Sequence, residues 1–536
     1  MKRILSAILA MAMILSMAAC GSTTETEETN TESTTTTETT ETTETEEESK
    51  EPEKEVPTVL RLSDTADIDT LDPMHSMLGS SGAILSLIYE NLIEYAYWYD
   101  ANGNTVSGYK GVLAEDWAFS DDYLTVTFNL KKGVLFQNGS EMKASDVVFS
   151  FQKAMESPSK QARMENIVST EATDDYTVVV TLSAVTPAFL DNMCRVPIIN
   201  EAYYNEVGAE EFGKAPMGTG PYKFVEHKEM QGTTVEAYED YRDGVAAIKT
   251  VTWDIMADPA SAQMAFEAGS FDKFSIALEN VDTVEASGQW NLIQTDNYAP
   301  VAMYVNNSHD ILGNVKVRQA IHYALNKDNM VTLAQDGKGS IADSFFHPEL
   351  MTNTTYVDEP YTYNVEKAKE LLADAGYANG EGLPTLKLIT ITKWEKHALC
   401  VQQDLAELGI NVEIQTLEAS TFLNDITVGN YDLAVNMAAL SNLVYPWRML
   451  YHSDFLGKTN FGQVNDPAID ELFNKLGATM SDDEQKAIIK ELVNYINVNV
   501  NYVPLTYTTS VTAYHPDLVI NGHPRSASAY DLSWAK

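Results

Sequence analysis

Alternating apolar and polar residues predict strands in the first half of the chain. Residues 124–130 (LTVTFNL) and 176–182 (YTVVVTL) alternate with a period of two, and residues 57–63 (PTVLRLS) predict a first strand. Residues 82–98 (GAILSLIYENLIEYAYW) predict a helix followed by a strand, and the pair Asn102-Gly103 predicts a tight turn after that strand.

Helices are predicted where apolar residues recur at helical spacing. Residues 145–155 (SDVVFSFQKAM) open with a Ser/Asp start signal, and residues 315–331 (VKVRQAIHYALNKDNMV) form an amphipathic pattern. Residues 364–377 (NVEKAKELLADAGY) predict another amphipathic helix, which Asn364 caps and Gly376 ends.

From Leu386 to Asn436 the predicted elements alternate strictly. Strand patterns (LKLITIT, INVEIQTL, YDLAVNM) are separated by helical patterns (KHALCVQQDLAEL, ASTFLNDITVG), with Gly409 after the first helix. This alternation is typical of a largely parallel sheet that helices cover, so the pattern predicts an α/β fold.

The first residues read as a secretory signal. Lys2 and Arg3 precede an apolar run from Ile4 to Met17, and this run of 14 residues is shorter than the ~20 that span a bilayer. The small residues before Cys20, with Gly21 and Ser22 after it, resemble the bacterial lipobox. That resemblance implies a lipid on Cys20 and removal of residues 1–19, whereas an ordinary signal peptide cut near a chance cysteine is the alternative.

Residues 20–56 are predicted to be a disordered tether. Residues 21–56 contain 13 Glu, 2 Lys and no aromatic residue, with Thr and Ser between them, so they offer little to bury and repel one another. A long tether on a lipidated cysteine places the protein at the extracellular face of the cell membrane and suits a bacterium with a single membrane.

Composition limits the partners of the remaining chain. The 480 residues from Pro57 are too many for one core and suggest two or three lobes. With 35 Lys and Arg against 78 Asp and Glu, the net charge of −43 disfavours nucleic acid as a partner. Cys194 and Cys400 lie too far apart to suggest a disulfide framework, so we expect two small buried thiols, with a bridge between them as the alternative.

Catalytic and metal motifs are weak or missing. Ser157 stands three residues before Lys160, but the companion motifs of a Ser-x-x-Lys enzyme are absent from the sequence, as are G-x-S-x-G, H-E-x-x-H and C-x-x-C. Asp100, Asn102 and Asn104 match the start of a calcium loop, yet Thr105 replaces its glycine, so a hairpin loop is the better interpretation. We expect no enzyme activity, no metal site and no cofactor.

Several segments together resemble a known family. The stretches YENL, LAEDWAFSDDYLTVTFNLKKGVLFQNGSEMKASDVVFSF, GTGPYKFVE, VRQAIHYALNKDNMV and AKELLADAGY are similar to the family 5 extracellular solute-binding proteins, the peptide- and nickel-type receptors of ABC importers. The likeness covers nearly all of residues 57–536 in the same order. It implies a two-lobed periplasmic-binding-protein-like fold of type II, in the large three-domain cluster, with mixed sheets and a ligand cleft between the lobes.

The resemblance also implies a division of the chain. Lobe I would comprise residues 57–99, 197–298 and 514–536, with an inserted domain at 100–196, and lobe II would comprise 299–513. The family motif at 217–222 (MGTGPY) is expected to be mainly structural and to lie near the cleft; its residues are Gly218, Thr219, Gly220, Pro221 and Tyr222.

The segment 437–452 (MAALSNLVYPWRMLYH) departs from the family pattern. Peptide binders carry an Asp a few residues before a Pro, which pairs with the ligand's α-ammonium; alignment on Pro446 puts the uncharged Asn442 there, with Ser441 as the near alternative. A slipped alignment, with another carboxylate in this role, stays open. Flat apolar faces are offered instead by Tyr445, Trp447 and Trp394. Ser80, Ser81 and Asn306 are further ligand-binding candidates, and the aromatic run Tyr95, Tyr97, Trp98 and Tyr99 either packs on a sheet or lines the cleft mouth.

The sequence therefore predicts a monomeric substrate-binding lipoprotein that captures an oligopeptide or peptide-like solute by lobe closure and delivers it to an ABC permease. A first alternative is the same fold with an oligosaccharide, opine-like or metal-chelate ligand. A secreted enzyme and a surface adhesin are alternatives of another class.

Overall fold

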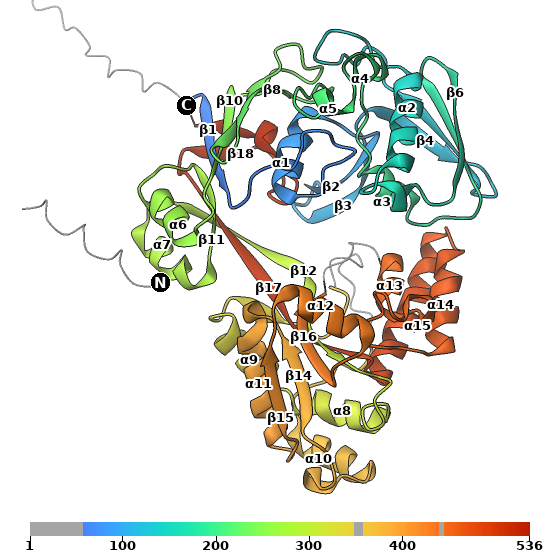
Figure 1. The fold of residues 1–536 in the computed structure, drawn as a ribbon, viewed down its shortest axis with the longest axis vertical. Helices are drawn as coiled ribbons and strands as arrows, with labels where there is room; N and C mark the ends of the chain where they lie inside the picture. Colours follow the sequence, from blue (N-terminus) through green and yellow to red (C-terminus); the bar gives the residue numbers. More distant parts are fainter. Residues whose placement is uncertain (1–56, 348–356, 439–443, 536) are drawn as a thin grey trace, which may run out of the picture. The chain divides into compact units, whose positions relative to one another are not determined.

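The computed structural model describes residues 57–347, 357–438 and 444–535. Within these ranges the chain is mixed α/β, with one seven-stranded sheet, two four-stranded sheets and two pairs of strands (Figure 1). No helix in these ranges is long and apolar enough to cross a membrane. The predicted α/β class is therefore what the described residues form.

The first four-stranded sheet has the order β1-β10-β9-β8. Its strands are β1 (Val59–Asp64), β10 (Thr250–Ile255), β9 (Gly232–Ala237) and β8 (Tyr222–Lys228). Strand β1 pairs with β10 in parallel and the other pairs are antiparallel, so the sheet is mixed as predicted. Helix α1 (Gly79–Ile88) begins after a loop from β1.

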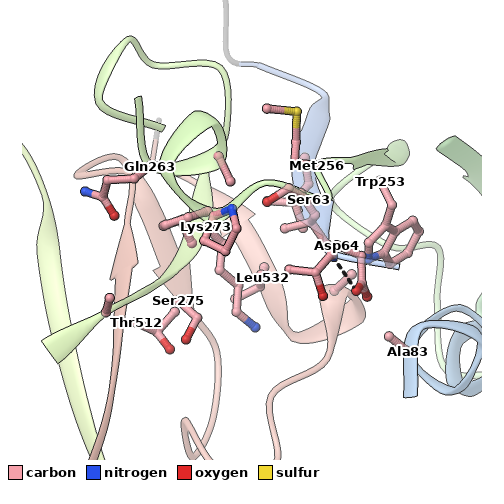
Figure 2. A pocket seen from close by; sticks show the side chains of 18 of the residues that line it. Ser63, Asp64, Ala83, Trp253, Met256, Gln263, Lys273, Ser275, Thr512 and Leu532 are labelled. Carbon is pink, nitrogen blue, oxygen red and sulfur yellow. Dashed lines mark hydrogen bonds between the residues drawn. The ribbon is translucent and has the colours of Figure 1, made fainter. Parts of the chain in front are cut away.

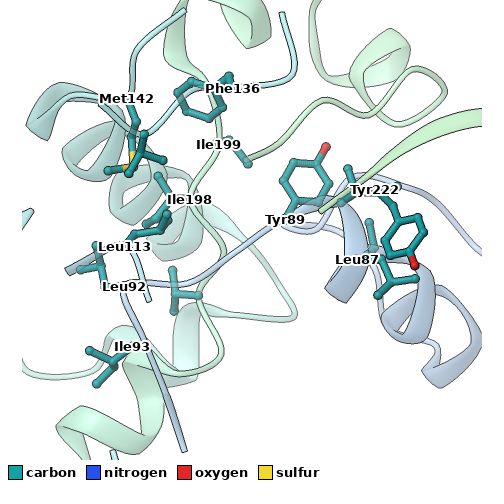
Figure 3. Close-up of a cluster of buried hydrophobic side chains, with 14 of the residues drawn as sticks. Leu87, Tyr89, Leu92, Ile93, Leu113, Phe136, Met142, Ile198, Ile199 and Tyr222 are labelled. Atoms are coloured by element: carbon teal, nitrogen blue, oxygen red, sulfur yellow. The ribbon is translucent and has the colours of Figure 1, made fainter. Parts of the chain in front are cut away.

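The second four-stranded sheet has the order β4-β5-β7-β6. Its strands are β4 (Ala114–Phe119), β5 (Thr125–Leu130), β7 (Thr177–Leu182) and β6 (Ile167–Asp174), with helix α2 (Ala144–Glu156) against it. The hairpin β2 (Ile93–Tyr99) and β3 (Thr105–Gly111) precedes this sheet. Both four-stranded sheets contribute to one apolar cluster, part of which Figure 3 shows around Leu92, Leu113 and Tyr222.

The seven-stranded sheet has the order β11-β17-β12-β16-β14-β15, and β13 also pairs with β17. Its strands are β11 (Lys273–Ile276), β17 (Tyr502–Tyr514), β12 (Asn291–Val305), β16 (Leu433–Met437), β14 (Leu386–Thr390), β15 (Val412–Thr416) and β13 (Gly339–Ile341). Strand β14 pairs in parallel with both β15 and β16, as the alternating pattern from Leu386 predicts.

Successive residues of this sheet enter two different cores, because side chains alternate between the faces of a strand. On β12, Met303 lies in one cluster with helices α8 (Val315–Ala324), α9 (Lys327–Ala334), α10 (Val365–Asp374) and α11 (Glu395–Ala406). Tyr304 lies in another cluster with α12 (Ala419–Val428), α13 (Arg448–Tyr451), α14 (Pro467–Gly477) and α15 (Asp482–Asn499). Both faces are thus covered.

The remaining α-helices and strands are short. They are α3 (Phe189–Met193), α4 (Glu201–Val207), α5 (Ala209–Phe212), α6 (Pro259–Glu267), α7 (Val281–Ser287), β18 (Leu518–Ile520) and β19 (Leu532–Trp534).

One predicted helix is wrong in its extent. The pattern at 315–331 predicts one helix, but Leu325 is extended and separates α8 from α9. The side chain of Asn326 then accepts a hydrogen bond from the backbone N–H of Asn329, so Asn326 caps a new helix. The helical spacing continues across this break and therefore conceals it.

The predicted lobe boundaries fall at informative places. Positions 298/299 and 513/514 lie inside β12 and β17, which pair with each other along most of their length. These long strands therefore belong to both predicted lobes. The division into lobe I, inserted domain and lobe II stays a prediction.

Candidate functional site

A cavity of about 560 Å³ lies where β12 and β17 pass between the predicted lobes; we call it the central cavity. Both predicted lobes contribute to its wall. The lining residues are Tyr97, Lys273, Ile293, Thr295, Asp296, Asn297, Tyr298, Ala299, Met437, Trp447, Thr512, Tyr514, Pro524 and Arg525. A volume of this size accommodates a small solute or a short peptide.

An irregularity in β12 presents polar groups to this cavity. The pairing of β12 with β17 loses register between Asp296 and Pro300, since a proline has no N–H for the ladder. Residues 297–299 form the bulge, and the amide of Asn297 donates to the Thr508 hydroxyl at 2.8 Å. The Thr509 hydroxyl donates to the Asp296 carboxylate at 2.8 Å. The bulge is therefore held from the neighbouring strand.

Arg525 joins the bulge to two neighbouring aromatic rings of the cavity wall, Tyr298 and Tyr97. Its Nη1 donates to the backbone carbonyl of Asp296 at 3.0 Å. Its guanidinium lies 4.3 Å from the ring centre of Tyr298 and 5.8 Å from that of Tyr97. Such contacts hold a cation next to aromatic faces, which gives the cavity positive charge within an acidic chain.

His523 contacts the hairpin β2–β3 next to the central cavity. The imidazole stacks on Tyr97 with ring centres 5.8 Å apart and lies 4.7 Å from the Tyr99 ring. Its Nε2 is 3.1 Å from the Thr105 hydroxyl. The aromatic run divides between two environments, because Tyr97 lines the central cavity whereas Tyr95 packs edge-on against Tyr109.

A second cavity, of about 930 Å³, is lined by residues from the segments 60–87, 253–280 and 512–532; we call it the apolar cavity. Figure 2 shows Ser275 and Thr512 on one side of it and Trp253 on the other. Its larger apolar lining residues are Leu60, Leu62, Leu87, Trp253, Met256, Phe274 and Leu532. Lys273 and Thr512 line both cavities, so the two spaces adjoin at β11 and β17.

Of the predicted ligand-binding residues that the structure describes, Trp447 lines the central cavity. Its side chain is otherwise buried, 5.1 Å edge-on from the Phe345 ring and 5.3 Å from the Phe346 ring. Tyr445 does not line either cavity; it packs against the same cluster, with the Arg448 guanidinium 5.4 Å from its ring.

The other described candidates have structural partners and line neither cavity. The Ser80 hydroxyl donates to the Asp67 carbonyl and the Ser81 hydroxyl to the Asp69 carboxylate. The amide of Asn306 donates to the Tyr431 carbonyl at 2.8 Å. Trp394 is buried in the cluster around α11. Their ligand-binding role stays a prediction.

The motif at 217–222 serves packing. Gly218 and Gly220 lie so close to the end of α1 that an added Cβ would come within 3.0 Å of the Ile88 carbonyl oxygen. Thr219 and Pro221 are buried, and the Tyr222 hydroxyl donates to the Ile248 and Ala529 carbonyls. The motif joins α1 to β8.

Three of the predicted site residues, Cys20, Ser441 and Asn442, lie outside the described residues. Both remaining cysteines are free, as expected, but Cys194 is half-buried and only Cys400 is buried. The expectation of two buried thiols was therefore wrong for Cys194.

Among the described residues no group of His, Cys, Asp or Glu side chains could hold a metal ion. Asp100 closes the hairpin turn, because its carboxylate accepts hydrogen bonds from the backbone N–H groups of Asn102 and Asn104.

Sequence reasoning missed Lys273, Asp296, Tyr298 and Arg525. They come from three separate segments, with Asp296 and Tyr298 on the same strand, and only the fold brings these segments together. The one local signal was the sequence NYAP at 297–300, in which a proline stands directly before an apolar run of the strand.

Comparisons with known proteins agree on one family. The model of the bacterial extracellular solute-binding proteins, family 5 Middle, matches residues 108–461. The chain is 29% identical to the oligopeptide-binding protein AppA of Bacillus subtilis, covering 70% of this chain and 73% of that protein. It is 25% identical to the heme-binding protein A of Haemophilus influenzae, with 83% and 85% covered. The crystal structure of the ABC transporter substrate-binding protein CtaP of Listeria monocytogenes matches with a TM-score of 0.77 at 25% identity, covering 90% of this chain and all of that one.

Proposed function

Since the chain belongs to the family 5 bacterial extracellular solute-binding proteins, which serve transport and are not enzymes, we propose that it captures an oligopeptide or peptide-like solute for an ABC importer. The observation that carries this proposal is the central cavity, because residues of both predicted lobes line it. A solute bound there contacts both lobes at once.

Closure around the solute is the proposed working step. Strands β12 and β17 run through both predicted lobes, so a change of twist in them would move one lobe relative to the other. Contacts that exist only in the closed state favour that state, and the closed form then docks on the permease.

A peptide fits the polar lining of the central cavity. The bulge at 297–299 interrupts the ladder and leaves backbone groups near the solute, and backbone contacts give broad tolerance of sequence. Trp447 and Tyr298 add flat faces for side chains. Tyr445, Trp394, Ser80, Ser81, Asn306, Asn442 and Ser441 remain proposed contacts from the sequence.

A non-peptide solute is the second candidate. The rings of Tyr97, Tyr298 and Trp447 line the central cavity and would also suit an oligosaccharide, an opine-like compound or a metal chelate. The neutral Asn442 in the aligned amine position favours this candidate over a free-amine peptide.

Attachment to the membrane is part of the proposal. We propose that Cys20 carries the lipid, that residues 21–56 act as a tether and that the protein works as a monomer at the outer face of the cell membrane.

Thermal unfolding in the presence of peptides, oligosaccharides and metal chelates tests the ligand class. A true ligand at a hundred times its Kd stabilises the folded protein by about 2.7 kcal/mol, which a rise in Tm reports. We expect this rise with peptides, together with a smaller radius of gyration in solution scattering.

The variant Tyr298→Ala should weaken binding about tenfold, because it removes an aromatic face of the central cavity. Tyr363→Ala is the matched control, since Tyr363 is exposed and lines neither cavity. Stabilisation by sugars or chelates alone would favour the second candidate, and no stabilisation by any of the three classes would contradict the proposal.

A further inference from the structure

Lys273 stands at the junction of the two cavities. It is the first residue of β11 and pairs with Tyr514 of β17. Its side chain is half-buried and lines both the central and the apolar cavity. Figure 2 shows it among the residues that line the apolar cavity. A ligand in either cavity therefore has Lys273 in the surrounding wall.

No protein carboxylate neutralises Lys273 in the described part of the chain. Its ammonium nitrogen lies 5.5 Å from the centre of the Tyr514 ring. The neighbouring Asp272 is bound by Arg61, whose Nη2 donates to it at 2.5 Å. In a chain with 78 acidic against 35 basic residues, a half-buried lysine without an acidic partner is unexpected.

The carboxylates that line the same cavities are otherwise engaged or exposed. Asp296 accepts from the Thr509 hydroxyl, and Asp64 accepts from the backbone N–H of Thr65 and of Ala66. Glu279 is exposed. Burial lowers the pKa of Lys273, and no nearby carboxylate offsets this effect. The ammonium is thus desolvated without compensation.

We infer that Lys273 is the cation for an anionic group of the solute, so that the ligand is a carboxylate with an apolar part beside it. This inference rests on the proposed function. The carboxylate would lie beside Lys273 at the start of β11, and the apolar part would enter the cavity that Leu60, Trp253 and Leu532 line. A charge-assisted hydrogen bond to the ammonium is strong in such a partly dry site.

Arg525 does not replace Lys273 in this role. Its guanidinium is held by the Asp296 carbonyl and by the ring of Tyr298, and it does not line the apolar cavity. Lys273 is the cationic side chain that lines both cavities.

Paired peptide libraries test the inference. A library of apolar tri- to hexapeptides is prepared as free acids and as C-terminal amides, and binding is measured by calorimetry and by mass spectrometry of retained peptides. We expect the wild type to retain free acids at least tenfold more tightly than the matching amides.

Variants at Lys273 assign the effect. Lys273→Met should abolish the preference for free acids, and Lys273→Arg should keep most of it. Lys228→Gln is the matched control, because Lys228 is exposed on β8 and lines neither cavity. Unliganded Lys273→Met should unfold at the wild-type temperature or above it, since an unpaired desolvated charge is removed.

The outcomes separate the two proposals. Equal binding of acids and amides by the wild type would overturn the role of Lys273 and leave solute capture standing. A preference for acids that persists in Lys273→Met would also overturn it, because another cation would then hold the carboxylate. Binding of neither library would contradict peptide capture and, with it, the inference.

Discussion

His397 of α11 is almost completely shielded from water behind β17. The amide of Gln335 donates to the Thr506 hydroxyl at 2.7 Å, and Thr506 lies 3.1 Å from His397 Nε2. With the Gln335 amide as donor, the Thr506 hydroxyl donates to Nε2, which fits a neutral imidazole with its proton on Nδ1. Burial, and in second place the charge of Lys396, lowers the pKa of His397 to about 4.

This buried histidine predicts acid sensitivity. Its pKa in the folded state is below the unfolded value near 6.5, so its stabilising effect is complete above pH 6.5 and is lost as the pH falls toward 4. The loss amounts to about 3 kcal/mol of the free energy of unfolding. Denaturant unfolding at several pH values should show this fall, and His397→Gln should flatten it.

A direct titration checks the cause. The imidazole signal of His397 in NMR should remain that of the neutral form down to about pH 5, and Lys396→Gln should move its midpoint slightly upward. A midpoint at 6.5 in the wild type would contradict the prediction.

Most residues of the candidate site could not be recognised one by one from the sequence. Trp447 was identified because it offers a flat apolar face beside Pro446, on which the segment 437–452 is aligned with the family pattern. Lys273 and Arg525 have no such local mark: one begins a short strand and the other follows Pro524 near the end of the chain. Their importance comes from the cavities, which no local pattern encodes.

At the scale of elements, local patterns carried most of the fold. The strands β5, β7, β14, β15 and β16 lie where period-two or buried apolar runs predict them. The break between α8 and α9 was missed, because its cause is the cap at Asn326, and an Asn inside a helical pattern is a weak signal. The bulge in β12 depends on pairing with a strand about 200 residues later, so it also escaped prediction.

The junction of α1 with β8 gives a prediction at this scale. Gly218→Ala places a Cβ within 3.0 Å of the Ile88 carbonyl oxygen and the Tyr89 ring. Both are buried, so the neighbours cannot move aside without cost. We expect the free energy of unfolding to fall by about 2–3 kcal/mol or more in chemical denaturation.

Gly82→Ala is the opposite case within α1 itself. Gly82 is exposed in the helix interior, and an added Cβ would meet nothing within 4 Å. Alanine should therefore stabilise the protein by about 0.5–1 kcal/mol. A neutral Gly218→Ala beside a stabilising Gly82→Ala would mean that the junction is looser than these contacts indicate.

At the scale of the whole molecule, the predicted two-lobed fold is confirmed by the solved structure to which the chain is similar. The resemblance to the family predicted the order of the segments along the chain. The spacing of apolar residues predicted most of the helices and strands. The division into lobes was less accessible, because β12 and β17 each belong to two predicted lobes and a strand pattern has no mark at such a crossing.

Attachment to the membrane is a property of the whole molecule. Residues 21–56 combine 13 Glu with no aromatic side chain, so they offer little apolar surface to a bilayer. Once residues 1–19 are removed, we propose that the lipid on Cys20 holds the protein at the membrane. Cys20→Ser should release folded protein into the medium, where immunoblots of cells and medium measure it.

A deletion within residues 21–56 distinguishes the anchor from the tether. Removing about 20 of these residues should leave both the attachment and the solution affinity unchanged, because the lipid stays on Cys20 and the cavities lie beyond Pro57. Retention of Cys20→Ser on washed cells, at the level of the wild type, would mean that another part of the chain binds the cell surface. The residues from Pro57 onward carry a large net negative charge, so adsorption to anionic lipid could not account for such retention. A protein receptor on the cell surface would then have to be sought.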